Sequence, residues 1–255
     1  MKHKILASIA LLLIVFQACT KEDISENGSN AANIAASKKT LGSSANDLLS
    51  DTKYKSMVIE LVYVDGFEPT ATAINNFVSF LQARTFKPDG ITVEKRAIPS
   101  LGSTEYTIEE IRDIEDANRT KFNASNQIAV WAFFTDGKSN EDTSEKVVLG
   151  TAYRNTSFVI YEQTVRNASN SAFEPNRSVL ETTVITHEFG HILGLTNLGT
   201  TMQTAHEDAE HPKHCNVESC LMYWESLVAS RLTNMGSAPQ LDAQCIADLQ
   251  ANGGR

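Results

Sequence analysis

The chain has 255 residues, of which 42% are hydrophobic and 21% are charged. These values are typical of one or two globular domains rather than of a disordered chain. The formal net charge is −9, whereas nucleic-acid binding needs a basic surface that pairs with phosphates. We therefore expect no nucleic-acid partner.

The first 19 residues predict an export signal. A basic start precedes an apolar run from Ile5 to Phe16, which is too short to span a bilayer comfortably, and small Ala18 stands before Cys19. This pattern resembles a bacterial lipoprotein signal, in which residues 1–19 form the signal peptide and Cys19 is lipidated and becomes the new N-terminus. The resemblance implies export and a lipid anchor in the outer membrane, with exposure at the cell surface as a further expectation. An ordinary cleaved signal with an incidental cysteine is the alternative.

Residues 20–53 predict a flexible tether. They are rich in Ser, Asn, Ala, Lys and acidic residues, and no aromatic residue occurs between Phe16 and Tyr54. Such a composition buries too little apolar surface to order a chain. We expect the folded domain to span residues 54–255.

Strands and helices alternate along this domain. The helix predicted after Pro69, for example, carries Ile74, Phe77 and Leu81 at helical spacing. Strands are predicted over 55–66, 91–98, 127–137, 147–155 and 157–165, and helices over 68–86, 107–122, 178–194 and 241–254. This order predicts an α/β (α+β) domain with a mixed twisted sheet, followed by an irregular C-terminal part after Gly194.

The sequence HEFGH at residues 187–191 predicts a metal site. Residues four apart lie on the same face of a helix, so His187 and His191 can direct two imidazoles at one ion. Zinc in a catalytic site takes three protein ligands and one water, whose pKa it lowers to about 7. Glu188 can reach this water without binding the metal and serve as general base. Gly194 allows a sharp turn that returns a third ligand to the ion.

This stretch resembles the metzincin zinc peptidases. The sequence HEFGHILGLTN matches their zinc motif at every fixed position except the last, where Asn197 replaces histidine. Downstream, CLMYW at 220–224 resembles the Met-turn, which implies that Met222 lies beneath the metal as an apolar floor. The resemblance implies a metzincin-like fold with Zn²⁺ as cofactor.

A closer resemblance is to archaemetzincins, in which the third histidine is followed at once by Cys, four residues, Cys, one residue and Met. HCNVESCLM at 214–222 fits this spacing, which assigns the third-ligand position to His214. The chain departs from the family in the 19 residues 195–213 and in the absence of a later Cys-x-x-Cys pair. We therefore expect a disulfide between Cys215 and Cys220 rather than a second zinc site.

The third ligand has alternatives. His206, His211, Asn197 and water all compete with His214, although imidazole is a better zinc ligand than an amide. Histidines that do not bind the metal can orient those that do.

Together these features predict a lipid-anchored, monomeric zinc endopeptidase that acts on proteins or peptides, with Glu188 as general base. Residues 149–162 supply the edge strand to which an extended substrate adds. Tyr223 is a further candidate for the specificity pocket or the oxyanion site. A non-catalytic surface binding protein on a metzincin scaffold is the main alternative, and a zinc hydrolase that cleaves another amide, such as one in the cell wall, is a third.

Overall fold

The computed structural model describes residues 31–255 except 145–146, 170, 172–173 and 228–236. The predicted signal peptide, the lipidation candidate Cys19 and the first part of the predicted tether lie outside the described residues. Within the part that is described, none of the helices combines the length and the apolar character needed to cross a membrane.

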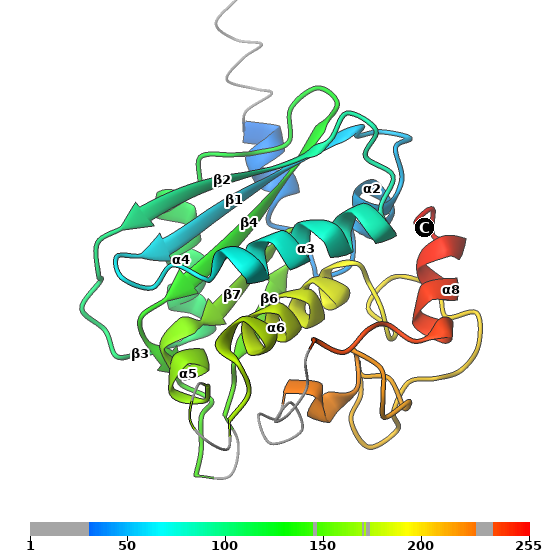
Figure 1. The fold of residues 1–255 in the computed structure, drawn as a ribbon. Helices are drawn as coiled ribbons and strands as arrows, with labels where there is room; N and C mark the ends of the chain where they lie inside the picture. The colour runs from blue at the N-terminus through cyan, green and yellow to red at the C-terminus, as the bar shows by residue number, and fades with distance from the viewer. Residues whose placement is uncertain (1–30, 145–146, 170, 172–173, 228–236) are drawn as a thin grey trace, which may run out of the picture.

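A five-stranded sheet forms the centre of the domain, with the strand order β2-β1-β4-β7-β6 (Figure 1). β1 pairs in parallel with β2 and β4, β4 pairs in parallel with β7, and β6 runs antiparallel to β7. The predicted mixed α/β sheet is confirmed, and β6 lies at its edge. The strands are β1 (Ser56–Val64), β2 (Ile91–Ile98), β4 (Gln127–Thr135), β6 (Gly150–Arg154) and β7 (Ser157–Tyr161), and the short β3 (Glu105–Tyr106) and β5 (Lys138–Ser139) pair separately.

The two faces of the sheet bury two separate cores. Alternate residues of a strand point to opposite faces, so Val130 of β4 packs into one core while Trp131 packs into the other. α3 and α6 cover the first face and α4 covers the second (Figure 1). The helices are α2 (Ala45–Leu49), α3 (Ala71–Arg84), α4 (Ile108–Asn118), α5 (Glu162–Asn167), α6 (Arg177–Ile192), the 3-10 helix η1 (Trp224–Leu227) and α8 (Ala243–Ala251).

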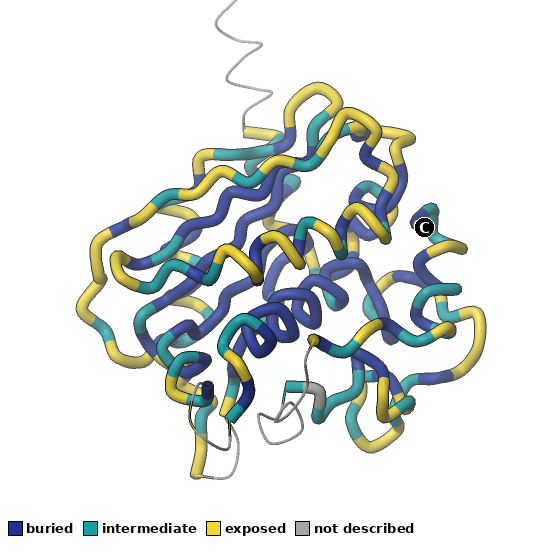
Figure 2. The backbone as a smooth tube through the Cα atoms, viewed as in Figure 1, coloured by how far each residue is buried: buried dark blue, intermediate teal, exposed yellow. Residues whose placement is uncertain are grey.

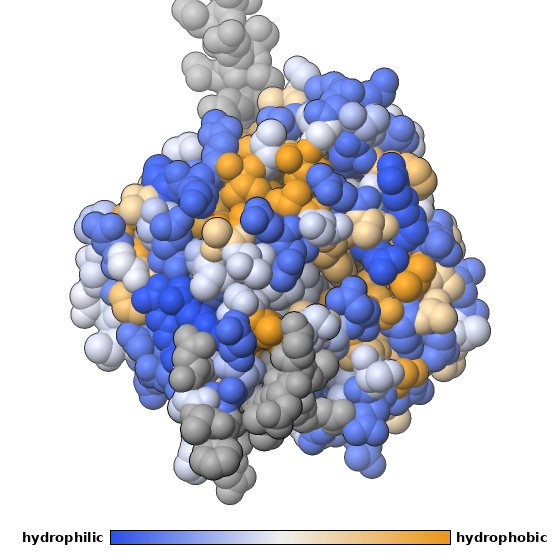
Figure 3. All heavy atoms as spheres, in the orientation of Figure 1, coloured by the Kyte–Doolittle hydropathy of each residue, from blue (hydrophilic) through white to orange (hydrophobic). Residues whose placement is uncertain are grey.

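The edge strand β2 is covered only in part. Ile91 and Val93 are half-buried against the first core, and Figure 3 shows hydrophobic side chains gathered over this part of the sheet. β6, the strand at the opposite edge, packs against α6, which contacts both β6 and β7.

α6 is buried along most of its length, and Figure 2 shows it as a nearly continuous buried helix. Its N-terminus is capped by Asn176, whose side chain accepts a hydrogen bond from the Ser178 amide. Phe189 packs edge-on against Phe77 of α3 and Phe158 of β7, with ring centroids 5.2 and 6.3 Å away. This packing fixes the helix that bears the HEFGH sequence against the sheet.

Several of the predicted boundaries are wrong. Residues 31–53 belong to the domain and not to a tether, because α2 buries Leu48 and Leu49 completely and Asn155 Nδ2 donates to the Ala36 carbonyl at 2.9 Å. The strand predicted over 157–165 ends at Tyr161, where α5 begins.

Four charged side chains anchor α6 to α5. Arg177 Nη2 lies 3.2 Å from Glu162 Oε1, and Arg177 Nε lies 2.7 Å from Glu181 Oε1. Arg166 Nε lies 2.8 Å from the same oxygen of Glu162. Burial, followed by repulsion from Glu181, outweighs these two arginines and raises the pKa of Glu162 to about 8.

We expect Glu162→Gln to make stability less dependent on pH. The folded protein holds the Glu162 proton more tightly than the unfolded chain, whose carboxyl has a pKa near 4.5. The stability that this proton contributes is complete below pH 4.5 and is lost as pH rises to about 8, with a slope of at most about 1.4 kcal/mol per pH unit. Urea unfolding at several pH values in this window measures the slope.

Glu60 provides a control of the opposite sign. Burial alone would raise its pKa, but hydrogen bonds from Arg96 and from the Lys121 and Thr120 amides lower it. Glu60→Gln should therefore remove stability that the wild type gains as pH rises through the acidic range. An unchanged slope in the Glu162 variant would contradict the assignment.

Candidate active site and metal centre

α6 presents two histidines one turn apart. The ring centroids of His187 and His191 are 4.8 Å apart, and His187 is 1% exposed. His187 Nδ1 lies 2.8 Å from the Leu221 carbonyl, a contact in which the ring N–H donates and which leaves Nε2 for another partner. Within the described residues, the buried Nδ1 of His191 has no hydrogen-bond partner, and a bound ion is one explanation of an unpaired buried polar atom.

The chain turns after α6 but does not bring a ligand back at once. Gly194 has φ +77°, a conformation that glycine adopts without steric cost. Asn197, which occupies the position of the missing histidine, is exposed and donates from Nδ2 to Glu207 at 3.1 Å. His206 is buried elsewhere, and His211 stacks on Trp224 with ring centroids 3.9 Å apart.

Among the described histidines, His214 is the one that joins the pair on α6. Its ring centroid is 5.4 Å from that of His187 and 5.3 Å from that of His191. One nitrogen from each of the three rings lies within 4.8 Å of the others. Of the alternatives that the sequence left open, the structure therefore places His214 in the third position.

The three imidazoles are held in their neutral form. Burial, with a smaller contribution from His214, lowers the pKa of His187 to about 4. Burial also lowers the pKa of His191 well below its usual range and lowers that of His214. Zinc binds neutral imidazole nitrogens, and three of them with one open position is a catalytic donor set. The residues therefore fit a zinc ion.

Met222 lies directly under α6. It is completely buried, and a Cβ added to Gly190 would overlap its Sδ atom. The turn is fixed because the Cys215 amide donates to the Met222 carbonyl at 2.8 Å. The Met222 thioether is thus an apolar group beneath the helix, and it directly follows Leu221, whose carbonyl accepts the hydrogen bond from His187.

Glu188 is fixed between α6 and the edge strand. It is 4% exposed, and its Oε2 accepts a hydrogen bond from the Ala152 amide of β6 at 2.8 Å. Gly150 of the same strand makes room for it, because an added Cβ would lie 2.8 Å from Glu188 Cγ. Burial raises the pKa of Glu188 to about 8, although the Ala152 hydrogen bond opposes the shift. A general base is most effective when its pKa lies near the working pH.

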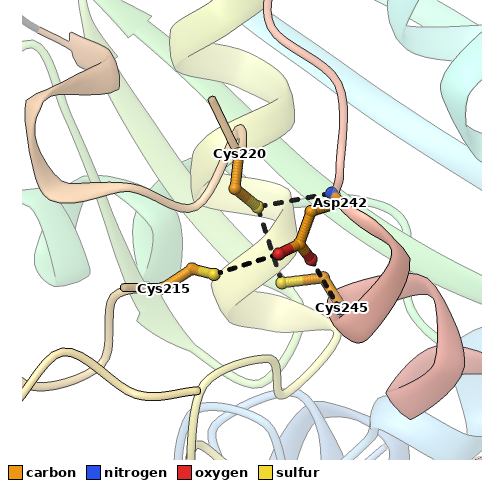
Figure 4. A group of neighbouring side chains, drawn as sticks. All are labelled: Cys215, Cys220, Asp242 and Cys245. Atoms are coloured by element: carbon orange, nitrogen blue, oxygen red, sulfur yellow. Dashed lines mark hydrogen bonds between the residues drawn. The ribbon is translucent and has the colours of Figure 1, made fainter. Parts of the chain in front are cut away.

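A second group of side chains that could hold a metal ion lies beside this centre (Figure 4). One ligand atom from each member lies within 4.8 Å of the others. The sulfurs of Cys220 and Cys245 are 3.6 Å apart, and Cys215 Sγ donates to Asp242 Oδ2 at 3.5 Å. The four residues, which we call the sulfur site, are Cys215, Cys220, Asp242 and Cys245.

The predicted disulfide between Cys215 and Cys220 is wrong, because both are free thiols. Their sulfurs point into the sulfur site instead, where Cys245 and Asp242 approach from the start of α8. Hydrogen bonds with Cys215 and Cys245 lower the pKa of Cys220, which favours the thiolate form that metals bind.

Sequence reasoning missed Asp242 and Cys245. Asp242 caps α8, because its side chain accepts a hydrogen bond from the Cys245 amide at 2.8 Å. The available signal was the spacing, since Asp242 and Cys245 are three apart like the ends of a Cys-x-x-Cys pair. An aspartate can supply zinc with an oxygen where a cysteine of such a pair would supply a sulfur.

No protein-family model matches the chain, and no curated protein matches it either. Among solved structures it is similar to archaemetzincin from Methanopyrus kandleri, with 18% identity over 78% of this chain and 96% of that chain and a TM-score of 0.49. It is also similar to a zinc-dependent peptidase from Methanocorpusculum labreanum, with 14% identity over 75% of this chain and 99% of that chain and a TM-score of 0.45.

Proposed function

We propose that the protein is a zinc-dependent endopeptidase, with zinc held by His187, His191 and His214. The observation that carries the proposal is the convergence of three neutral imidazoles beside a buried carboxyl at the edge of the sheet. A purely structural metal site needs no such carboxyl, and this one is held at a backbone amide of the edge strand.

Glu188 acts as the general base. When bound, zinc polarises the scissile carbonyl and makes the attacking water more acidic. Glu188 takes a proton from this water, whose oxygen bonds to the carbonyl carbon. As the C–N bond breaks, Glu188 passes the proton to the leaving nitrogen.

β6 binds the substrate as an additional strand. Among the strands of the described residues it pairs only with β7, and an extended peptide can pair with its other side through main-chain hydrogen bonds. Because the Ala152 amide at this edge already holds Glu188, a peptide that pairs here lies next to the general base. Protein or peptide substrates fit this arrangement.

The sulfur site holds a second zinc with a structural role. Three sulfurs and one carboxylate oxygen complete a four-ligand set, and such closed sites stabilise the fold. Export and a lipid anchor at Cys19 remain predictions from the sequence, and so does the monomeric state.

We expect chelator-sensitive cleavage of a peptide library by the full chain, and we expect His214→Gln to abolish it. The loss of a ligand should weaken zinc binding at this centre by more than about 100-fold, because even partners outside the coordination sphere cost about 10- to 100-fold. Metal analysis and cleavage are measured on the same samples.

His211→Gln is the matched control, because His211 lies in the same segment but stacks on Trp224. It should keep both zinc and activity. A wild-type protein that binds zinc but cleaves no peptide would instead support the non-catalytic binding protein.

A further inference from the structure

His206 is fully buried although the sequence suggested it only as a competing zinc ligand. Both of its ring nitrogens have partners: Nδ1 lies 3.4 Å from Cys215 Sγ, and Nε2 lies 2.7 Å from Asp248 Oδ2. Asp248 is also fully buried, and its Oδ1 accepts from the Gln203 amide at 2.6 Å. An unbroken hydrogen-bonded path therefore runs from α8 through the imidazole to a sulfur of the sulfur site.

The backbone on either side brings this pair to the cysteine. Glu207 and Cys215 form an antiparallel bridge, and the Asn216 amide donates to the His206 carbonyl at 2.8 Å. Asp248 lies on α8, the helix that also bears Cys245. The pair therefore joins two chain segments that both contribute to the sulfur site.

A buried aspartate–histidine pair is costly unless every polar atom has a partner, and here both ring nitrogens and both carboxylate oxygens have one. In metal sites, a carboxylate commonly orients an imidazole that binds the metal. Here the carboxylate orients an imidazole whose partner is the sulfur of Cys215. The imidazole therefore does not bind the metal itself but contacts the sulfur that would.

The position of Cys215 also fixes the active site. Cys215 directly follows His214 in the chain, and its amide is bound to the carbonyl of Met222. Adjacent residues thus point into two different centres, His214 toward the imidazoles and Cys215 toward the sulfurs. A displacement of Cys215 would displace His214.

We propose that Asp248 and His206 are positioning residues that hold the Cys215 sulfur in the sulfur site and, through the chain, hold His214 toward His187 and His191. The inference rests on the second metal of the proposed function. It gives residues 195–213, where the chain departs from the archaemetzincin pattern, a role in metal binding through His206.

The test uses Co²⁺ as the probe, added to the metal-free full chain and then displaced by Zn²⁺. Absorption from thiolate-to-cobalt charge transfer reports the sulfur site separately from the imidazole site. Asp248→Asn and His206→Gln should weaken metal binding at the sulfur site by about 10- to 100-fold. Asp248→Asn keeps the shape of the side chain, so it remains informative where His206→Gln fails to fold.

Asp208→Asn is the matched control. Asp208 bonds His211 Nδ1 at 3.2 Å, but that histidine stacks on Trp224 and not on a cysteine. The affinity of the Asp208→Asn variant for metal at the sulfur site should stay within about twofold of the wild type. This change is well below the 10-fold loss of affinity that is the least expected for a positioning residue.

Thermal unfolding of the metal-free and loaded forms separates positioning from packing. A positioning role lowers the stability of the loaded form more than that of the metal-free form. Equal losses in both forms, or unchanged affinity in both variants, would overturn the inference. A wild type without the thiolate absorption would remove the second metal and the inference with it, while chelator-sensitive cleavage would leave the proposed peptidase standing.

Discussion

Replacing Glu188 by glutamine is expected to remove nearly all peptide cleavage while leaving the metal in place. Glutamine has the same shape, and its amide oxygen can still accept the Ala152 hydrogen bond, but it cannot take a proton from water. General bases contribute about 10²- to 10⁴-fold to the rate, so kcat should fall by this amount. KM should change little, because β6 and the three imidazoles are untouched.

Glu162→Gln is the control for this substitution. Glu162 is also a buried carboxyl whose pKa burial raises to about 8, but its ion pairs are with Arg166 and Arg177. The control should cleave like the wild type. Steady-state kinetics and metal analysis of both variants check the expectation, and normal cleavage by Glu188→Gln would show that another group activates the water.

The helix of the site could be predicted because the residues that define it are neighbours in the sequence. His187 and His191 are one helical turn apart, so a helix alone brings them to one face. The ranges of the helix and of the strands β1, β2 and β4 likewise follow from apolar stretches along the sequence. The third position was harder to predict. Four candidates compete within 18 residues, and only the fold shows that Asn197 turns outward while His206 turns toward α8.

The sulfur site could not be derived from spacing because it is closed by distant residues. Twenty-one residues separate Cys220 from Asp242, and the path of the chain between them decides whether they meet. Because the fourth member of the site is an aspartate, the spacing of cysteines in the sequence does not reveal it. The short separation of Cys215 and Cys220 instead favoured a disulfide between them. In the structure both are free, and together with Cys245 they form part of the sulfur site.

Composition misled the prediction for residues 31–53 in a similar way. The segment is polar on average, and the importance of its few apolar residues, including Leu48 and Leu49, depends on the core into which they pack. Gly42 of this segment lies against the backbone of Leu198, in the loop that follows α6. An average over the segment cannot detect contacts made by single residues.

Gly42→Ala is therefore expected to destabilise the domain strongly. Gly42 has φ +76°, and an added Cβ would overlap the Leu198 carbonyl oxygen and lie 2.7 Å from its carbon. Both neighbours are backbone atoms, so neither can move aside by changing a rotamer. We expect a loss of about 3 kcal/mol or more, the sum of left-handed strain and a forced backbone shift. Urea unfolding of the full chain measures this loss.

Gly102→Ala separates these two contributions. Gly102 has nearly the same φ, +78°, but an added Cβ meets nothing within 4 Å. It should cost only the left-handed strain, about 1 to 2 kcal/mol, so the excess loss in Gly42→Ala measures the docking of residues 31–53 against the end of the metal-binding helix. Equal losses in the two variants would mean that the segment lies loosely there, and the domain would then begin near residue 54 as its composition suggests.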